Sequence, residues 1–333
     1  MSAPVTVEIT RGPLVESRHP VDVCVVDARG GRVLVRGEVD APVFPRSAVK
    51  GIQAIPLVAT GAADRLGITD AEIALACASH SGEPAHAETA AAMLAKAGRD
   101  VDALGCGCHW PMGVRAAREL AARGERPSAL HNNCSGKHAG FVCLACGGLD
   151  VDPEGYLAAQ HPVQERVRLA LETVTGAAHR AEARGIDGCS IPTYAVPLAA
   201  LALGFARFGT GIGLSADDAR AAARIRAAVA AHPFMVAGTD RFDTLAMEAL
   251  GARAFLKTGA EGVYCAALPE VGLGIALKCE DGTGRAAEIV MASLLLRFLD
   301  IEEPARRTIE RLARPVITNW NGIVVGEMRT AAY

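Results

Sequence analysis

The chain has 333 residues and a formal net charge of −3, and half of its residues are hydrophobic. This composition supports a substantial core and excludes a disordered chain. A near-neutral charge without basic clusters argues against nucleic acid or an anionic membrane as the main partner. Only five of the 34 basic residues are Lys: Lys50, Lys96, Lys137, Lys257 and Lys278. Arg fills the other basic positions, so each Lys raises the question of why Arg would not serve there.

The N-terminal segment has no basic stretch followed by an apolar one, so no signal peptide is expected. The longest uncharged run, residues 188–206, is interrupted by Pro192 and Pro197, which argues against a membrane span. Ten cysteines without an export signal fit a reducing cytosol better than a disulfide framework. We therefore expect a soluble cytoplasmic protein with mostly core-filling cysteines.

The predicted elements follow one another in a simple order along the chain. Short apolar or alternating runs predict strands at 4–10, 21–27 and 32–36, with a Gly-Gly turn after the second. Helical patterning runs from Ser47 to about Leu66, residues 73–78 form a buried strand or short apolar segment, and 84–97 is an Ala-rich helix. Further helices are expected near 113–123, 135–147, 162–174, 197–207, 216–231 and 240–249. Strands at 261–268 and 271–279, a turn at 281–284 and a helix over 285–299 follow.

Strands at both ends with helices between them indicate an α+β fold. The N- and C-terminal segments would share one antiparallel sheet, and a helical lobe would be inserted between them. The chain contains no internal repeat or low-complexity linker. We therefore expect a single two-lobed catalytic domain over residues 1–333.

A Ser-x-x-Lys sequence stands at the first predicted helix start. Residues three apart share a helix face, so the Lys50 amine can reach the Ser47 hydroxyl. A desolvated Lys can accept the Ser proton, whereas Arg stays protonated. The alternative is a helix-capping Ser47 beside a solvent-exposed Lys50.

A later Lys257-Thr258-Gly259 sequence strengthens the catalytic interpretation. Serine β-lactamases and penicillin-binding proteins combine Ser-x-x-Lys with a later Lys-Thr-Gly on an edge strand. The order here is the same, although a Ser-Asp-Asn element is absent. The two sequences together indicate Ser–Lys acyl transfer.

Between these two sequences lies a polar loop, Ser79-His80-Ser81-Gly82-Glu83, before the helix that begins near Pro84. Two hydroxyls, an imidazole and a Gly turn are typical of a loop that binds a small polar substrate. A capped helix start with Ser81 as the cap is the structural alternative, and both interpretations can hold together.

Two further polar turns contain cysteines. Cys134 and Lys137 are three residues apart at another helix start, with His138 adjoining them, and Asp187 precedes Cys189 in a second turn. Two thiolates from separate turns could bind one Zn²⁺, with nitrogen and water completing a tetrahedron. Two distant cysteines can equally be core residues, so the sequence alone leaves both alternatives open.

Taken together, these segments resemble the thermolabile, rhizobial-type (class 3) L-asparaginase family. The motifs that carry the resemblance span nearly the whole chain in order: Arg11-Gly12 with Glu16-Ser17-x-His19, Arg46-Ser47-Ala48-x-Lys50, Ser79-His80-Ser81-Gly82-Glu83, His131-Asn132-x-Cys134-Ser135-Gly136-Lys137-His138, Asp187-Gly188-Cys189 and Lys257-x-Gly259-Ala260-Glu261-Gly262. The resemblance implies a serine β-lactamase-like fold, hydrolysis of L-asparagine to L-aspartate and ammonia, and a homodimer.

The resemblance also implies the site. Two Ser–Lys tandems carry over, Ser47 with Lys50 and Ser79 with Lys257, and a zinc ion maps onto Cys134, Lys137 and Cys189 with a water. In the mechanism we expect, Lys50 deprotonates the nucleophile Ser47, and Ser79, tuned by Lys257, relays protons. Ser79 could instead be the nucleophile. The expected substrate-binding residues are Arg46, His80, Glu83, Asp187 and His138.

Other functions remain open at this stage. A glutaminase, or another small-amide or β-lactam hydrolase, could use the same Ser–Lys centre. From a different class, the chain could be a non-catalytic, zinc-dependent asparagine sensor.

Overall fold

The computed structural model describes residues 2–331 and is built around one antiparallel sheet with the strand order β11-β12-β1-β2-β10-β9-β8, with β3 also paired to β2. Its strands are β1 (Val5–Arg11), β2 (Leu14–Asp27), β3 (Arg32–Arg36), β8 (Phe255–Thr258), β9 (Val263–Leu268), β10 (Leu273–Cys279), β11 (Val316–Thr318) and β12 (Val324–Thr330). Two small ribbons pair β4 (Pro42–Val43) with β7 (Val196–Pro197) and β5 (Arg184–Ile186) with β6 (Pro192–Tyr194).

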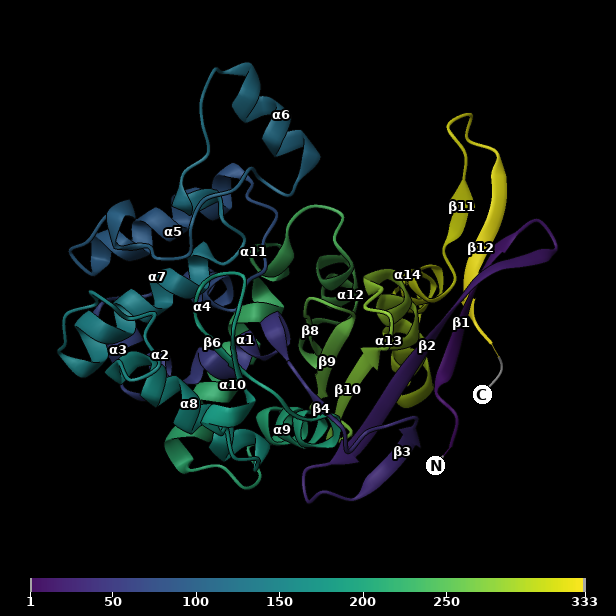
Figure 1. Cartoon of the computed structure of the whole chain (residues 1–333), viewed down its shortest axis with the longest axis horizontal. Helices are drawn as coiled ribbons and strands as arrows, with labels where there is room; N and C mark the ends of the chain where they lie inside the picture. Colours follow the sequence, from purple (N-terminus) through teal and green to yellow (C-terminus); the bar gives the residue numbers. More distant parts are fainter. Residues whose placement is uncertain (1, 332–333) are drawn as a thin grey trace.

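The helices form a separate lobe and two layers against the sheet (Figure 1). They are α1 (Lys50–Gln53), α2 (Ile55–Ala59), α3 (Ala62–Arg65), α4 (Asp70–Ala76), α5 (Pro84–Lys96), α6 (Val114–Ala122), α7 (Ser135–Leu144), α8 (Pro162–Thr175), α9 (Leu198–Thr210), α10 (Ala216–Ala231), α11 (Pro233–Ala237), α12 (Phe242–Leu250), α13 (Gly284–Phe298) and α14 (Ala305–Ala313). The 3₁₀ turn η1 (Arg46–Val49) precedes α1, and a π-helical turn, η4 (Ala145–Leu149), follows α7.

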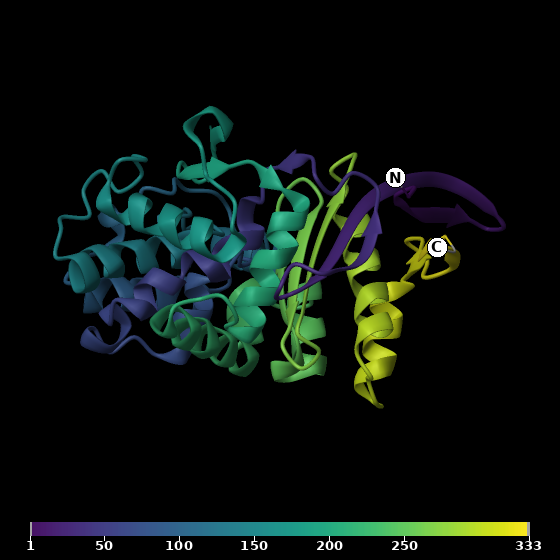
Figure 2. The ribbon, with the colours of Figure 1, turned by 90° about the horizontal axis from the view of Figure 1, so that it is seen from below.

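The sheet is covered on both faces only in its central part. Helix α9 packs against β2, β9 and β10, and α13 contacts the same strands, so that the sheet lies between them (Figure 2). Every residue of β9 is therefore buried, and β10 is nearly so, which matches their continuous apolar sequences. The first half of β2 lies beyond these helices and alternates between exposed and partly buried residues.

The architecture confirms the predicted α+β fold, in which the N- and C-terminal segments share one antiparallel sheet. The N-terminal strands β1 and β2 pair with the C-terminal strands β12 and β10, and the helices α1 to α8 lie between them in the chain. The prediction of one two-lobed domain over 1–333 stays a prediction, and Met1, Ala332 and Tyr333 lie outside the described residues.

Several predicted elements differ from the structure. Residues 73–78 are not a strand but belong to α4 and its end, because Thr69 and Glu72 form a reciprocal capping box that starts a helix. The helix expected from Ser47 to Leu66 is broken into η1, α1, α2 and α3. Pro56 lacks an amide hydrogen and can only stand at a helix start, and Gly61 adopts a left-handed φ of 77° between α2 and α3. The hairpin of β11 and β12 and the helix α14 were not predicted.

Candidate active site

The hydroxyl of Ser79 lies between two lysine amines. Lys50 Nζ is 3.0 Å from Ser79 Oγ, and Lys257 Nζ is 3.1 Å from the same oxygen. Ser79 is only 7 % exposed, and both lysines are fully buried. The predicted pairing of Ser79 with Lys257 is therefore present, and Lys50, from the other predicted tandem, joins it.

The fold brings these three residues together from separate elements. Lys50 begins α1, Ser79 follows the end of α4, and Lys257 lies on the edge strand β8. Helix α7 can approach α4 closely because Gly136 has no side chain: a Cβ there would lie 2.3 Å from the Leu75 carbonyl oxygen. The Ser79 amide donates to the Val236 carbonyl at 2.9 Å, which ties the loop after α4 to α11.

Ser47 occupies a different environment from Ser79. It lies in η1, is half-buried, and its hydroxyl makes no hydrogen bond to another residue within 2–331. The backbone of Gly259 lies against this turn, since a Cβ on Gly259 would be 2.7 Å from the Pro45 carbonyl oxygen and 3.2 Å from the Ala48 amide. The Lys-Thr-Gly strand thus borders the Ser47 turn.

The expected direct contact between Ser47 and Lys50 is not present in the structure. Lys50 Nζ instead contacts the Ala78 carbonyl oxygen, Ser79 Oγ and, at 3.1 Å, Cys134 Sγ. The sequence spacing placed both residues on one side of a turn. The long Lys50 side chain, however, is buried among acceptors that belong to the neighbouring segments.

Burial controls the charge of Lys257. Removal from water, together with the charges of Lys50 and Arg241, lowers the pKa of its amine, and the charge of Asp243 opposes this shift, so that the net pKa is about 7. A lysine with a pKa near 7 exists in both charge states at neutral pH. It can therefore act as a general base and then as a general acid, as the sequence led us to expect.

His80 and Glu83, both predicted to bind substrate, are engaged by the protein itself. The Gly82 amide donates to His80 Nδ1 at 3.1 Å, so Nε2 carries the hydrogen and lies 2.9 Å from Ser135 Oγ. Burial holds the pKa of His80 well below its ordinary value, so the ring is neutral. Glu83 accepts hydrogen bonds from the amide and hydroxyl of Thr239 at 2.8 and 2.6 Å. Both residues hold the Ser79 loop in place.

The three predicted zinc ligands lie together. Lys137 Nζ is 2.8 Å from Cys189 Sγ, Cys134 and Cys189 share a hydrogen bond, and all three side chains are buried. The hydrogen bond from Cys189, aided by the nearby lysines, holds the pKa of Cys134 well below its ordinary value. Two sulfurs and one amine nitrogen are donors that suit Zn²⁺. No group of three or more His, Cys, Asp or Glu side chains that could hold a metal is found within residues 2–331.

Arg46 and Asp187 form an ion pair at the edge of this cluster, with Arg46 Nε 2.7 Å from Asp187 Oδ1. Burial raises the pKa of Asp187, but the charges of Lys137 and Arg46 outweigh it and lower the pKa overall. Arg46 has a φ of 52° and Ser190, next to Cys189, a φ of 74°. Left-handed backbone in non-glycine residues is typical of turns at functional sites.

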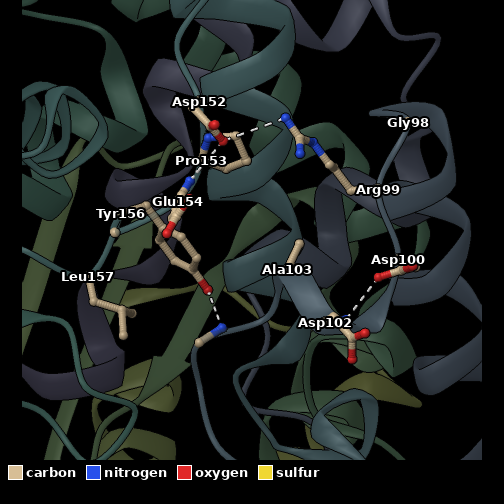
Figure 3. Close-up of a pocket in the computed structure, with 12 residues that line it drawn as sticks. Gly98, Arg99, Asp100, Asp102, Ala103, Asp152, Pro153, Glu154, Tyr156 and Leu157 are labelled. Carbon is tan, nitrogen blue, oxygen red and sulfur yellow. Dashed lines mark hydrogen bonds and ion pairs between the residues drawn. The ribbon is translucent and has the colours of Figure 1, made fainter.

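His138 lies behind the cysteine cluster. Its Nδ1 is 2.6 Å from the Tyr156 hydroxyl, while its buried Nε2 has no hydrogen-bond partner among the described residues. The Tyr156 hydroxyl also accepts the Gly105 amide at 2.8 Å, and Tyr156 lines a surface cavity of about 550 Å³ (Figure 3). Four of the residues that line this cavity are acidic: Asp100, Asp102, Asp152 and Glu154. It contains none of the predicted site residues.

Two neighbours of Lys257 were missed in the sequence. Asp243 and Tyr264 are buried and hydrogen-bonded to each other behind the Lys-Thr-Gly strand. A single Asp in the first turn of a helix normally indicates a capping or dipole interaction at the surface. Only the packing of α12 against β8 brings this carboxylate close to the active site.

The profile of the L-asparaginase II family matches residues 7–330. No curated protein matches the chain. Two solved structures titled Mglu, one of them in its native form, are 16 % and 15 % identical, each with a TM-score of 0.44. Each match covers 85 % of this chain, and 69 % and 66 % of those chains. A mutant of simvastatin synthase (LOVD) from Aspergillus terreus is 12 % identical over 88 % of both chains, with a TM-score of 0.38.

Among the helices within residues 2–331, none is both long enough and apolar enough to cross a membrane. The match to the family profile covers nearly the whole chain and agrees with the asparaginase resemblance inferred from the motifs. The chain therefore belongs to the L-asparaginase II family of enzymes.

Proposed function

We propose that the protein hydrolyses L-asparagine to L-aspartate and ammonia through a covalent Ser–Lys mechanism. The observation that carries this proposal is the Ser79 hydroxyl, held by two buried lysine amines beside the Ser47 turn in a member of the L-asparaginase II family. The direct test measures ammonia released by the purified protein from L-asparagine, L-glutamine and a chromogenic β-lactam in parallel. Release from asparagine alone supports the proposal. Asparagine binding without ammonia release would indicate a sensor instead.

Ser47 is the proposed nucleophile, because its hydroxyl is half-buried and free while Ser79 is enclosed by lysines. Ser47 Oγ attacks the side-chain amide carbon of asparagine, and its proton passes to Lys50 through Ser79, whose hydroxyl contacts the Lys50 amine. The C–N bond then breaks, the amide nitrogen takes up a proton through the Lys50–Ser79–Lys257 chain, and ammonia leaves. A water then attacks the β-aspartyl ester, which releases aspartate and restores the Ser47 hydroxyl.

Two backbone amides are suitable oxyanion donors. The amides of Ser47 and Ala260 donate no hydrogen bond to other residues within 2–331. Ala260 follows Gly259, whose backbone packs against the Ser47 turn. Donors that are already in place where negative charge develops stabilise the transition state without reorganisation.

The α-amino and α-carboxylate groups of the substrate need charged partners. We propose that Arg46 receives the α-carboxylate and Asp187 the α-ammonium group, so that the substrate divides the ion pair they form with each other. His138 supports this end of the site from behind through its contact with Tyr156. His80 and Glu83 act by holding the Ser79 loop.

We further propose that one Zn²⁺ is held by Cys134, Lys137 and Cys189. Lys137 and Cys134 both contact Cys189, and the chemistry of the three donors suits the ion. Lys137 must lose a proton to bind, although Cys134 and Cys189 raise its pKa against the lowering effect of burial. When bound, the ion would supply a positive charge that orients the polar end of the substrate.

Purified protein is accordingly expected to retain about one zinc per chain by elemental analysis. Cys189→Ser should weaken zinc binding by more than about tenfold, because it replaces a thiolate ligand. The matched control is Cys143→Ser, since Cys143 is a buried thiol bonded to the Met93 carbonyl oxygen outside the cluster. A wild-type protein that takes up no zinc after reconstitution would contradict this proposal.

A homodimer is supported by the terminal arm, defined as the β1–β2 hairpin tip (residues 10–17) with β11 and β12. The tip of the β1–β2 hairpin extends beyond the helices (Figures 1 and 2), β12 contacts α13 and α14, and no residue of β11 or β12 is buried. It carries a group of exposed apolar side chains: Leu14, Val316, Trp320, Ile323 and Val324. Its charges are paired internally, for instance Arg314 with Glu327 at 2.7 Å and Arg11 with Glu16 at 3.0 Å.

This apolar, charge-balanced surface suits the same surface of a second copy, with the edge strand β11 at the twofold axis. Sedimentation velocity is expected to show a dimer for the wild type and a monomer for Trp320→Glu combined with Val324→Glu. Val33→Glu is the matched control, because Val33 is exposed on β3 outside the arm. A wild-type monomer, or a dimer that survives the double substitution, would contradict the arm as the interface.

We also place the protein in the cytoplasm. All ten of its cysteines are free thiols, and eight of them are buried. The proposed zinc ligands must also remain reduced, which suits a reducing compartment.

A further inference from the structure

A buried carboxylate lies behind Lys257 and takes no part in the mechanism above. Asp243 is only 2 % exposed, although it carries an ionisable side chain. The Tyr264 hydroxyl donates a hydrogen bond to Asp243 Oδ1, while Asp243 Oδ2 has no hydrogen-bond partner among the described residues. A buried carboxylate with one bonded oxygen is costly unless a nearby cation balances it.

The chain connects Asp243 to both halves of the Ser–Lys centre. Asp243 is the second residue of α12, which packs against the Lys257 strand β8. Its partner Tyr264 lies on β9 directly opposite Thr258, the residue after Lys257. The segment before α12 carries the Val236 carbonyl that accepts the Ser79 amide. Asp243 is therefore held in a fixed position relative to Lys257 and Ser79.

Asp243 acts on Lys257 through space. Within the described residues no ion pair of 4.0 Å or less joins the two side chains, and Lys257 Nζ is bonded to Ser79 Oγ and the Thr258 carbonyl oxygen. Burial lowers the pKa of Lys257, and the negative charge of Asp243 raises it, so that the net value is about 7. Without that negative charge, only Cys134 would oppose the lowering of the Lys257 pKa by burial and by the neighbouring cations.

We propose that Asp243 is a positioning residue for Lys257, whose fixed negative charge stabilises the ammonium that forms when Lys257 takes a proton from Ser79. The inference rests on the proposed Ser–Lys mechanism and deepens it. A buried carboxylate behind a catalytic imidazole has the same effect on the imidazolium in serine proteases. Tyr264 keeps the carboxylate in place through its hydrogen bond.

Other ionisable groups also face this centre, and the experiment must separate them. Glu288 on α13 faces Asp243, and burial and the charge of Asp243 raise its pKa to about 7. The groups whose charges act on Lys257, or that feel its charge, are Lys50, Arg241, Asp243, Cys134, Cys77 and Cys265. Of these, Asp243 is the only carboxylate, so its removal takes away the negative charge that raises the pKa of Lys257 most.

The scarcity of lysine makes a direct measurement feasible. With five lysines in the chain, ¹³Cε-lysine labelling yields five signals, and the Lys257 signal is the one missing from Lys257→Met. We expect the wild-type signal to titrate near pH 7 and the Asp243→Asn signal at about pH 6 or lower. Asp243→Glu should restore a value near that of the wild type. Glu248→Gln, on the exposed side of the same helix, should leave the titration unchanged.

A folded Asp243→Asn protein whose Lys257 titration matches the wild type would overturn the inference. If Asp243→Asn does not fold at pH 6, the double variant Asp243→Asn/Lys257→Met is expected to fold, because it removes both charges together. A double variant as unstable as the single one would also overturn the inference. The Lys257 titration needs no substrate. A wild type that releases no ammonia would therefore refute the proposed function, and the titration would still show whether Asp243 controls the charge of Lys257.

Discussion

Ser47→Ala is expected to lower ammonia release from L-asparagine by about 10⁴-fold or more, because it removes the attacking oxygen. Ser47 is the hydroxyl in the site that is both half-buried and free of hydrogen bonds within the described residues. Steady-state kinetics measure the loss. Mass spectrometry with a slow substrate should detect an acyl adduct on the wild type and none on Ser47→Ala.

Ser79→Ala provides the complementary result. It should slow turnover by about 10²- to 10⁴-fold through loss of the proton relay, while an acyl adduct still forms on Ser47. Ser293→Ala serves as the control, since Ser293 donates to the Ile289 carbonyl oxygen within α13, away from the site. An acyl adduct that still forms on Ser47→Ala would show that Ser79, and not Ser47, is the nucleophile.

Lys257→Arg is expected to reduce kcat by about 10²-fold or more, since a guanidinium stays protonated and cannot accept a proton from Ser79. The change keeps the positive charge, so a loss of activity separates proton transfer from electrostatic attraction. Lys96→Arg is the matched control, because Lys96, the last residue of α5, forms an ion pair with Glu72 at 2.5 Å and bonds to the Gly67 carbonyl oxygen, outside the Ser–Lys centre. Circular dichroism should confirm that both variants are folded.

The pH dependence of the wild type follows from the same lysine. Lys257 must be neutral to act as a base, and its pKa lies at about 7 because burial disfavours the charged form. The neutral fraction, and with it kcat/KM, should rise about tenfold between pH 6 and pH 8. A rate that is flat from about pH 6 to pH 9 would contradict a general-base lysine.

The candidate active-site residues could be proposed from the sequence because their patterns depend on local chemistry. Ser-x-x-Lys at a helix start, Lys-Thr-Gly after an apolar run, and cysteines in two polar turns are patterns that a short segment carries by itself. The order of the predicted elements, with strands at both ends of the chain and helices between them, also predicted that the terminal segments share one sheet. These predictions needed no knowledge of distances between segments.

Contacts between segments were less predictable. Spacing predicted that Lys50 reaches Ser47, but the structure directs its amine to Ser79 and Cys134. A flexible four-carbon side chain takes the position set by surrounding acceptors, and these come from residues that are distant in the chain. The apolar run at 73–78 could form a strand or a helix, and the capping box at Thr69 and Glu72 decided between them.

The sequence by itself determined the α+β class and the asparaginase family and proposed the reacting groups, because residue types and their local spacing carry this information. Only the tertiary structure decided which lysine amine contacts which serine hydroxyl. It also placed Asp243 behind Lys257. Burial is the physical reason. The pKa of a lysine and the cost of a carboxylate depend on how much water remains around them and on which charges lie nearby, and only the packed fold sets both.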